Sequence, residues 1–180
     1  EIILRDGQFC NLTEVVVRAE DKQKDIMRKV RLASILGTFQ ASLTNIKRLR
    51  PKWVHNTEEE ALLGVSLTGI MDNEFMNGNN TDRGHYGKRS LPDFLSDLKK
   101  ETVKTNEHWS ELLGIQQATA TTAIKPSGTV SQLVDSASGI HTRHSDYYIR
   151  RVRADAKDPI AQLMEDQGIP AEADVMKPNS

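Results

Sequence analysis

The residues best suited to chemistry lie at 125–131, with the sequence KPSGTVS. An apolar, β-branched run at residues 119–124 predicts a buried strand before them, which Pro126 ends because proline donates no hydrogen bond to a sheet ladder. A tight turn and a helix are expected to follow, with Ser127 or Thr129 as the N-cap. Free N–H groups at a helix start attract anions. The pattern indicates a phosphate-binding loop, and the alternative is an ordinary strand-to-helix connection.

The single cysteine, Cys10, is the second candidate. A cysteine in a strand is usually an inert core residue. The polar neighbours Asn11 and Glu14 instead favour a reactive thiol. One cysteine excludes a disulfide within the chain and a metal site built from thiolates alone.

Charged residues after the loop leave two questions open. His141, His144 and Asp146 are possible metal ligands, but their spacing is not typical of a zinc site, which favours a hydrogen-bonding or substrate-contacting role. A basic set consists of Arg143, Arg150, Arg151 and Arg153. These arginines either converge on a polyphosphate or are solvated at a strand edge.

The elements that must position these residues alternate along the chain. Strands are predicted at residues 10–17, 63–70, 119–124 and 147–153, and helices at 21–43, 91–112 and 160–167. This alternation is typical of an α/β fold with a largely parallel sheet or barrel.

Local signals define parts of these helices. In the first helix, an apolar stripe at helical spacing predicts the buried face, and it consists of Leu32, Leu36, Phe39 and Leu43. The small residues Ala33, Ser34 and Gly37 permit close packing against a neighbour. Ser90 and Asp93 predict a capping box, and Gly114 predicts the end of that helix. Residues 48–52 are interpreted as a basic connector, and residues 58–60 as a solvated face or a first helical turn.

Composition limits the function classes. The 180 residues are 37% hydrophobic and 27% charged, with a formal net charge of −1. Balanced charge gives no electrostatic case for direct DNA binding. No apolar run is long enough to span a membrane. We therefore expect a cytoplasmic protein without membrane contact, and the strand-like start and the unclosed end predict that both termini are truncated.

Three motifs together resemble the large, catalytic subunits of ribonucleotide reductases. Residues 9–15 (FCNLTEV) resemble the Cys-Asn-Leu strand of that family, and residues 125–131 resemble its substrate-phosphate loop. Residues 139–153 are most similar to the monomeric class II enzymes, which depend on adenosylcobalamin. The motifs occur in the order of the family, and the resemblance runs over essentially the whole chain.

The resemblance implies a fold and an activity. The fold is the ten-stranded α/β barrel of thiyl-radical enzymes, with residues 1–180 as part of a single catalytic barrel domain. The activity is reduction of ribonucleoside triphosphates to 2′-deoxyribonucleoside triphosphates for DNA synthesis. Adenosylcobalamin would supply the radical, through residues not assignable in this segment, and a thioredoxin-type dithiol would be the reductant.

The resemblance also implies roles for individual residues. Glu1 matches the glutamate that ends the family motif Asn-Pro-Cys-Gly-Glu, whose radical cysteine would precede this chain, and it would act as general base at the 3′ hydroxyl. Cys10 would be one of two thiols that reduce the 2′ position. The implied substrate-binding residues are Asn11, Ser127, Gly128, Thr129, Val130 and Ser131, with no metal ligand. Without the radical cysteine, the segment alone is expected to be inactive.

Two alternatives remain. A segment of a class I ribonucleoside-diphosphate reductase large subunit would need a radical-supplying partner protein in place of cobalamin. A non-catalytic phosphate-binding module would keep the loop and lack the radical chemistry. Because part of a barrel exposes sheet edges and apolar faces, the isolated segment is expected to be poorly soluble.

Overall fold

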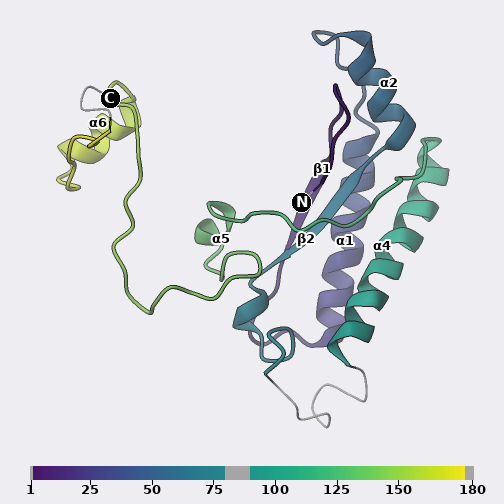
Figure 1. Ribbon diagram of the computed structural model, residues 1–180, viewed down its shortest axis with the longest axis horizontal. Coiled ribbons are helices and arrows are strands. Elements are labelled where there is room, and N and C mark those ends of the chain that lie inside the picture. Colours follow the sequence, from purple (N-terminus) through teal and green to yellow (C-terminus); the bar gives the residue numbers. More distant parts are fainter. Residues whose placement is uncertain (1, 80–89, 177–180) are drawn as a thin grey trace. The chain divides into compact units, whose positions relative to one another are not determined.

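The computed structural model describes residues 2–79 and 90–176, and Glu1 lies outside them. Contacts between residues divide the chain into a first unit that ends at Arg143 and a second that begins at His144. The first unit contains β1 (Asn11–Val16), α1 (Gln23–Ala41), α2 (Pro51–Glu60), β2 (Leu63–Thr68), the 3-10 helix η1 (Ile70–Asp72), α4 (Leu91–Leu113) and α5 (Val130–Leu133) (Figure 1). The second contains α6 (Pro159–Asp166). None of the helices described has both the length and the hydrophobicity needed to cross a membrane.

The sheet of the first unit is a parallel pair, which confirms the first two predicted strands. Asn11 of β1 lies opposite Leu63 of β2, and the register continues to Val16 opposite Thr68. Because β1 and β2 are parallel, a crossover must join them, and it contains α1 and α2.

The strand predicted at residues 119–124 is wrong in extent. It forms a single parallel bridge, between Thr122 and Val65. The N–H groups of Leu63 and Val65, two residues apart on β2, donate to the adjacent carbonyls of Ala120 and Thr121. The register therefore shifts within the segment, and a regular ladder cannot continue.

The strand predicted at residues 147–153 is also wrong. These residues belong to the second unit and carry no helix or strand assignment. Tyr147 and Ile149 are 94% and 92% exposed. An extended segment becomes a strand only when a neighbour accepts its backbone hydrogen bonds, and no such neighbour is present among the residues described.

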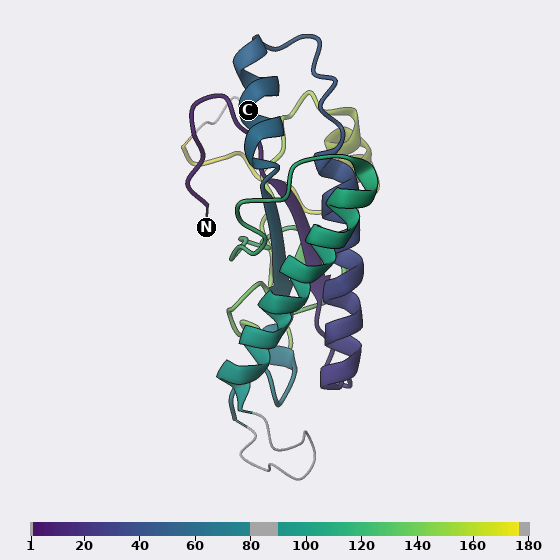
Figure 2. The same cartoon turned by 90° about the vertical axis from the view of Figure 1, so that its right-hand side faces the viewer.

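Helices cover one face of the sheet. α1 packs against β1, β2 and α4, and α1 and α4 lie side by side in both ribbon views (Figures 1 and 2). The shared core consists of Val15, Val17, Ile26, Val30, Ala33, Val65, Phe75, Met76, Phe94 and Leu98. Each large apolar side chain buried in such a core stabilises the fold by roughly 1.5–3 kcal/mol.

The buried face of α1 differs from the predicted apolar stripe, whereas the close packing predicted for its small residues is confirmed. The four large apolar residues of the predicted stripe are exposed, from 41% for Phe39 to 75% for Leu43. The buried face also includes small residues: Ala33, Ser34, Gly37, Thr38 and Ala41. A Cβ at Gly37 would lie 3.2 Å from Cδ2 of Leu63, so α1 needs small side chains where it approaches β2.

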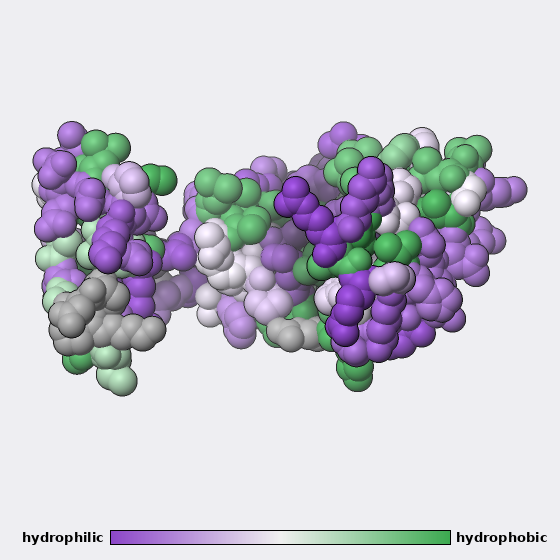
Figure 3. All heavy atoms as spheres, turned by 90° about the horizontal axis from the view of Figure 1, so that it is seen from above, coloured by the Kyte–Doolittle hydropathy of each residue, from purple (hydrophilic) through white to green (hydrophobic). Residues whose placement is uncertain are grey.

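Figure 3 shows hydrophobic side chains interleaved with hydrophilic ones on the face that it draws.

The ends of α4 confirm their sequence signals, whereas α2 corrects another. The Ser90 hydroxyl accepts a hydrogen bond from the N–H of Asp93, and Gly114 ends α4 with a φ of 66°. The predicted basic connector instead leads into a helix that begins at Pro51, which suits a first helical position. Residues 58–60 therefore form the last turn of α2, not a first turn, and the exposed Glu58 and Glu59 agree with the alternative of a solvated face.

Candidate functional site

Side chains of β1 alternate between the two faces of the sheet. A Cβ at Gly64 of β2 would lie 2.5 Å from Cδ2 of Leu12 and 3.1 Å from Sγ of Cys10. The methyl group of Thr13 instead approaches Gly37 of α1. Since strand side chains alternate, Cys10, Leu12 and Glu14 share the face turned away from α1, which we call the open face.

Cys10 is held as a neutral thiol on the open face. Burial raises its pKa to about 11, because a thiolate loses hydration when it is removed from water. The side chain is half-buried and free of any disulfide. A protonated thiol is a weak nucleophile but retains the hydrogen that a reductant must supply.

The loop at residues 125–131 docks on the same open face. The hydroxyl of Ser127 donates to Oε2 of Glu14 at 2.8 Å. The backbone N–H of Lys125 donates to the Ser66 hydroxyl of β2 at 3.1 Å, and Nζ of Lys125 lies 3.7 Å from Oε1 of Glu14. The structure therefore brings the phosphate-loop candidate and the cysteine candidate to one side of one sheet.

Two of the predicted phosphate ligands have their hydroxyls engaged within the protein. Ser127 and Ser131 are buried, and the hydroxyl of Ser131 donates to the carbonyl of Ser127. Gly128, Thr129 and Val130 are exposed, and their N–H groups donate to no acceptor among the described residues. Thr129 is the N-cap of the single-turn helix α5, without a side-chain capping bond. The exposed backbone is therefore the part of the loop available to an anion.

Asn11 lies on the opposite face from Cys10. It is 6% exposed, and its side-chain amide donates to the carbonyl of Leu62 at 3.0 Å. This bond joins the start of β1 to the residue that precedes β2. The substrate-binding role of Asn11 stays a prediction, as does the role of Glu1, which lies outside the described residues.

An ion-pair cluster fixes the segment that follows α5. Arg143 pairs with Asp72 at 2.9 Å and with Asp135 at 2.8 Å, and Arg18 donates to the carbonyl of Asp135 at 2.7 Å. Burial of Asp72 raises the pKa of its carboxyl group, but hydrogen bonds from Arg143 and from the Ala137 N–H outweigh it and lower the pKa overall.

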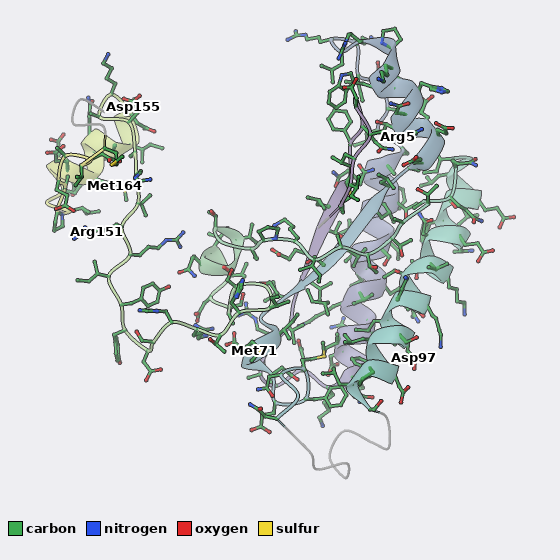
Figure 4. All side chains as sticks on the ribbon, in the orientation of Figure 1. Arg5, Met71, Asp97, Arg151, Asp155 and Met164 are labelled. Carbon is green, nitrogen blue, oxygen red and sulfur yellow. The ribbon has the colours of Figure 1, made fainter. Side chains whose placement is uncertain are left out.

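Two of the remaining arginines form ion pairs within the second unit. Arg151, labelled in Figure 4, pairs with Glu172, and Arg153 pairs with Asp174, all within the second unit. Across residues 2–79 and 90–176, no three His, Cys, Asp or Glu side chains are grouped closely enough to hold a metal ion.

Sequence reasoning missed Ser66 and Asp72. It named Glu14 only as a polar neighbour of Cys10 and Lys125 only as part of the stretch at residues 125–131, without a role of its own for either. Glu14 carried the clearest signal, since it is the one charged residue in the strand predicted at residues 10–17 and has the same alternation as Cys10. Its partners in the loop are separated from it by more than a hundred residues, so no local pattern indicated them.

Comparison with known proteins gives consistent sequence matches, although no family model matches the chain. The adenosylcobalamin-dependent ribonucleoside-triphosphate reductase of Lactobacillus leichmannii is 29% identical over 201 residues, which cover 100% of this chain and 26% of that protein. A probable enzyme of the same name from Dictyostelium discoideum is 30% identical and covers 85% of this chain and 19% of that protein. The chain thus spans about a quarter of the length of the first of these curated relatives.

A solved structure agrees with these matches. The crystal structure of a B12-dependent (class II) ribonucleotide reductase matches 98% of this chain and 26% of its own, with a TM-score of 0.60 and 25% identity. The resemblance to class II ribonucleotide reductases is thereby confirmed over essentially the whole chain. The chain is homologous to a segment of the adenosylcobalamin-dependent, class II ribonucleotide reductases.

Proposed function

We propose that the protein carrying this chain reduces ribonucleoside triphosphates to 2′-deoxyribonucleoside triphosphates by thiyl-radical chemistry. The observation that carries the proposal is the placement of Cys10 and the loop at residues 125–131 on one face of a parallel sheet. A nucleotide held by its phosphates at the loop would extend its ribose along that face. The homologous relatives carry the same activity in their names.

Each proposed site residue has a defined task. The N–H groups of Gly128, Thr129 and Val130 would bind phosphate oxygens, and the hydroxyls of Ser127 and Ser131 would hold the loop in shape. The neutral thiol of Cys10 would reduce the 2′ position of the ribose together with a second thiol. Glu1 would accept the proton of the 3′ hydroxyl.

Adenosylcobalamin is the proposed cofactor, and homolysis of its carbon–cobalt bond would supply the radical. Cys10 fits this chemistry because it is held in the protonated form that a reductant requires. No contact with the cobalamin is assigned to a residue of this chain. The proposed electron source is a thioredoxin-type dithiol, and the proposed location is the cytoplasm.

The proposed architecture is a single catalytic barrel domain to which residues 1–180 contribute one part. The parallel order of β1, β2 and the bridge at Thr122 supports it, because a barrel of this class adds parallel strands through helical crossovers. The edges of β1 and of residues 120–123 would then pair with strands from the rest of the protein.

Deoxynucleotide formation by the full-length protein tests the proposal. The protein is incubated with a ribonucleoside triphosphate and a dithiol, with and without adenosylcobalamin. Product is expected only when adenosylcobalamin is added. Product formed without it, in the presence of an iron- or manganese-bearing partner, would contradict the assignment and favour a class I enzyme. No product under any of these conditions would favour a non-catalytic phosphate-binding module.

A further inference from the structure

Glu14 contacts both residues that flank Pro126. Its Oε2 accepts the hydroxyl of Ser127 at 2.8 Å, and its Oε1 lies 3.7 Å from Nζ of Lys125. The Glu14 side chain is 8% exposed, and its Oε1 is buried without a hydrogen bond from any residue that the structure describes. A carboxylate from the middle of β1 therefore lies directly beneath the loop.

We propose that Glu14 and Lys125 form a charge pair that positions this loop and neutralises the sheet face beneath it, so that the loop accepts the phosphates of a nucleotide. This inference rests on the proposed function and assigns two positioning residues to its phosphate site. Neither residue is placed in contact with the reacting ribose.

Glu14 and Lys125 are of opposite charge, and both lie beside the loop. A buried carboxylate beneath an anion site repels a polyphosphate, and the repulsion is strong where water is excluded. Lys125 is the cation beside Glu14, at ion-pair distance, and it cancels this charge. Removal of the lysine would leave an unpaired buried charge, which costs far more than the loss of a surface ion pair.

Lys125 is held in place independently of a ligand. Its backbone N–H donates to the Ser66 hydroxyl, and its ammonium group donates to the carbonyl of Pro126 at 3.2 Å. The side chain is 23% exposed. The pair is thus formed before a nucleotide arrives, and the loop does not need to be ordered by its ligand.

The test measures the KM for a ribonucleoside triphosphate and the inhibition constant of tripolyphosphate, a probe without base or sugar. It uses the full-length holoenzyme with Lys125→Met, Lys125→Arg, Glu14→Gln and the double variant Glu14→Gln/Lys125→Met. The matched control is Lys100→Met, because Lys100 is exposed on α4 and pairs at 3.3 Å with Asp97, which Figure 4 labels.

Lys125→Met is expected to raise both constants by about tenfold or more, since one member of a desolvated charge pair is left alone. Lys125→Arg keeps the charge and is expected to stay close to wild type. The double variant removes the repelling carboxylate and is expected to recover most of the loss, although it removes two interactions. A purely structural role predicts the reverse, with the double variant at least as impaired as Lys125→Met.

Two outcomes would overturn the proposal. One is a Lys125→Met variant that behaves like Lys100→Met, and the other is a double variant that recovers nothing while its thermal unfolding matches that of wild type. If the double variant unfolds at a lower temperature than wild type, the single variant Glu14→Gln decides instead. Glutamine removes the repelling charge, so weaker tripolyphosphate binding by Glu14→Gln would overturn the proposal. A wild-type enzyme that neither reduces nor binds the nucleotide would instead refute the proposed function, and this inference with it.

Discussion

Cys10 is the residue whose reactivity the structure constrains most directly. With its pKa raised to about 11 by burial, the thiolate fraction at pH 8 is far below that of a free thiol. A more basic thiolate is also more nucleophilic, so alkylation by iodoacetamide is expected to be about tenfold slower than in the urea-unfolded chain. The rate should keep rising up to about pH 11. Mass spectrometry measures it at this single cysteine, and equal rates in the folded and unfolded chain would contradict the burial.

The same shift affects stability with a definite sign. Below pH 9.0 both the folded and the unfolded chain keep the thiol proton. As the pH rises from 9.0 toward about 11, the unfolded chain releases that proton first, so the folded state loses stability in this window. The free energy of unfolding, measured with urea, is expected to be lower at pH 10.5 than at pH 8. This difference is expected to be smaller in Cys10→Ala, which has no thiol to titrate.

In the full-length protein, Cys10→Ser is expected to stop multiple turnover with the dithiol reductant. A serine hydroxyl cannot form the disulfide in which the two reducing thiols would end. The measurement is deoxynucleotide formed per enzyme, with Ser96→Ala, at an exposed position of α4, as the control. Sustained turnover in Cys10→Ser would remove Cys10 from the proposed mechanism.

Gly64 gives Cys10 the space it occupies. Its Cβ in Gly64→Ala would lie 2.5 Å from Leu12 and 3.1 Å from Cys10, so one of them must move. The expected loss of unfolding free energy is about 1–3 kcal/mol, as for other overpacked sites. Gly128→Ala is the control for stability, because a Cβ at that position would meet no atom within 4 Å. Equal urea midpoints for the two variants would contradict this account.

Among the elements, α1 and α4 meet along a buried polar seam. Asn106 of α4 is 2% exposed, donates to the hydroxyl of Thr38 at 3.1 Å and accepts the N–H of Ala118 at 2.9 Å. Thr102 bonds to Thr121 at 2.8 Å. These bonds hold the segment that leads into the phosphate loop, so the two helices position the site from the far face of the sheet.

Asn106→Leu tests the seam at nearly constant volume. The N–H of Ala118 and the hydroxyl of Thr38 lose a partner, and the expected cost is about 1–3 kcal/mol for each buried group left unsatisfied. Urea unfolding measures the total, and hydrogen exchange at Ala118 localises it. Glu107→Ala, at an exposed position of the same helix, is expected to be near neutral. Unchanged protection of Ala118 would contradict the role of the seam.

The elements also show what local sequence can predict. The ends of α4 followed from Ser90 and Gly114 because caps are local interactions. The small residues of α1 predicted its close packing, but Leu32 and Leu36 did not predict its buried face, because the residue that Gly37 approaches belongs to β2. The same holds for the candidate site. Its motifs were located from the sequence, but the hydrogen bond from Ser127 to Glu14 joins residues that only the fold brings together.

For the whole molecule, the division into two units predicts where proteases act. Residues 144–158 are exposed and contain no helix or strand. Trypsin is therefore expected to cut at Arg150, Arg151 or Arg153 before it cuts within α1 or α4, because local unfolding precedes cleavage inside a packed helix. Mass spectrometry of a digestion series identifies the order, and earlier cleavage within either helix would contradict it.

The bond between Glu14 and Ser127 also bears on how the chain acquires its structure. It spans 113 residues, and the parallel pairing of β1 with β2 must already be present for Glu14 to face the loop. Contacts between such distant residues form slowly, because the entropy of closing a long loop opposes them. We expect the helices to form early and the loop to reach the open face late. A nascent chain would therefore have its helices before it had a place to bind phosphate.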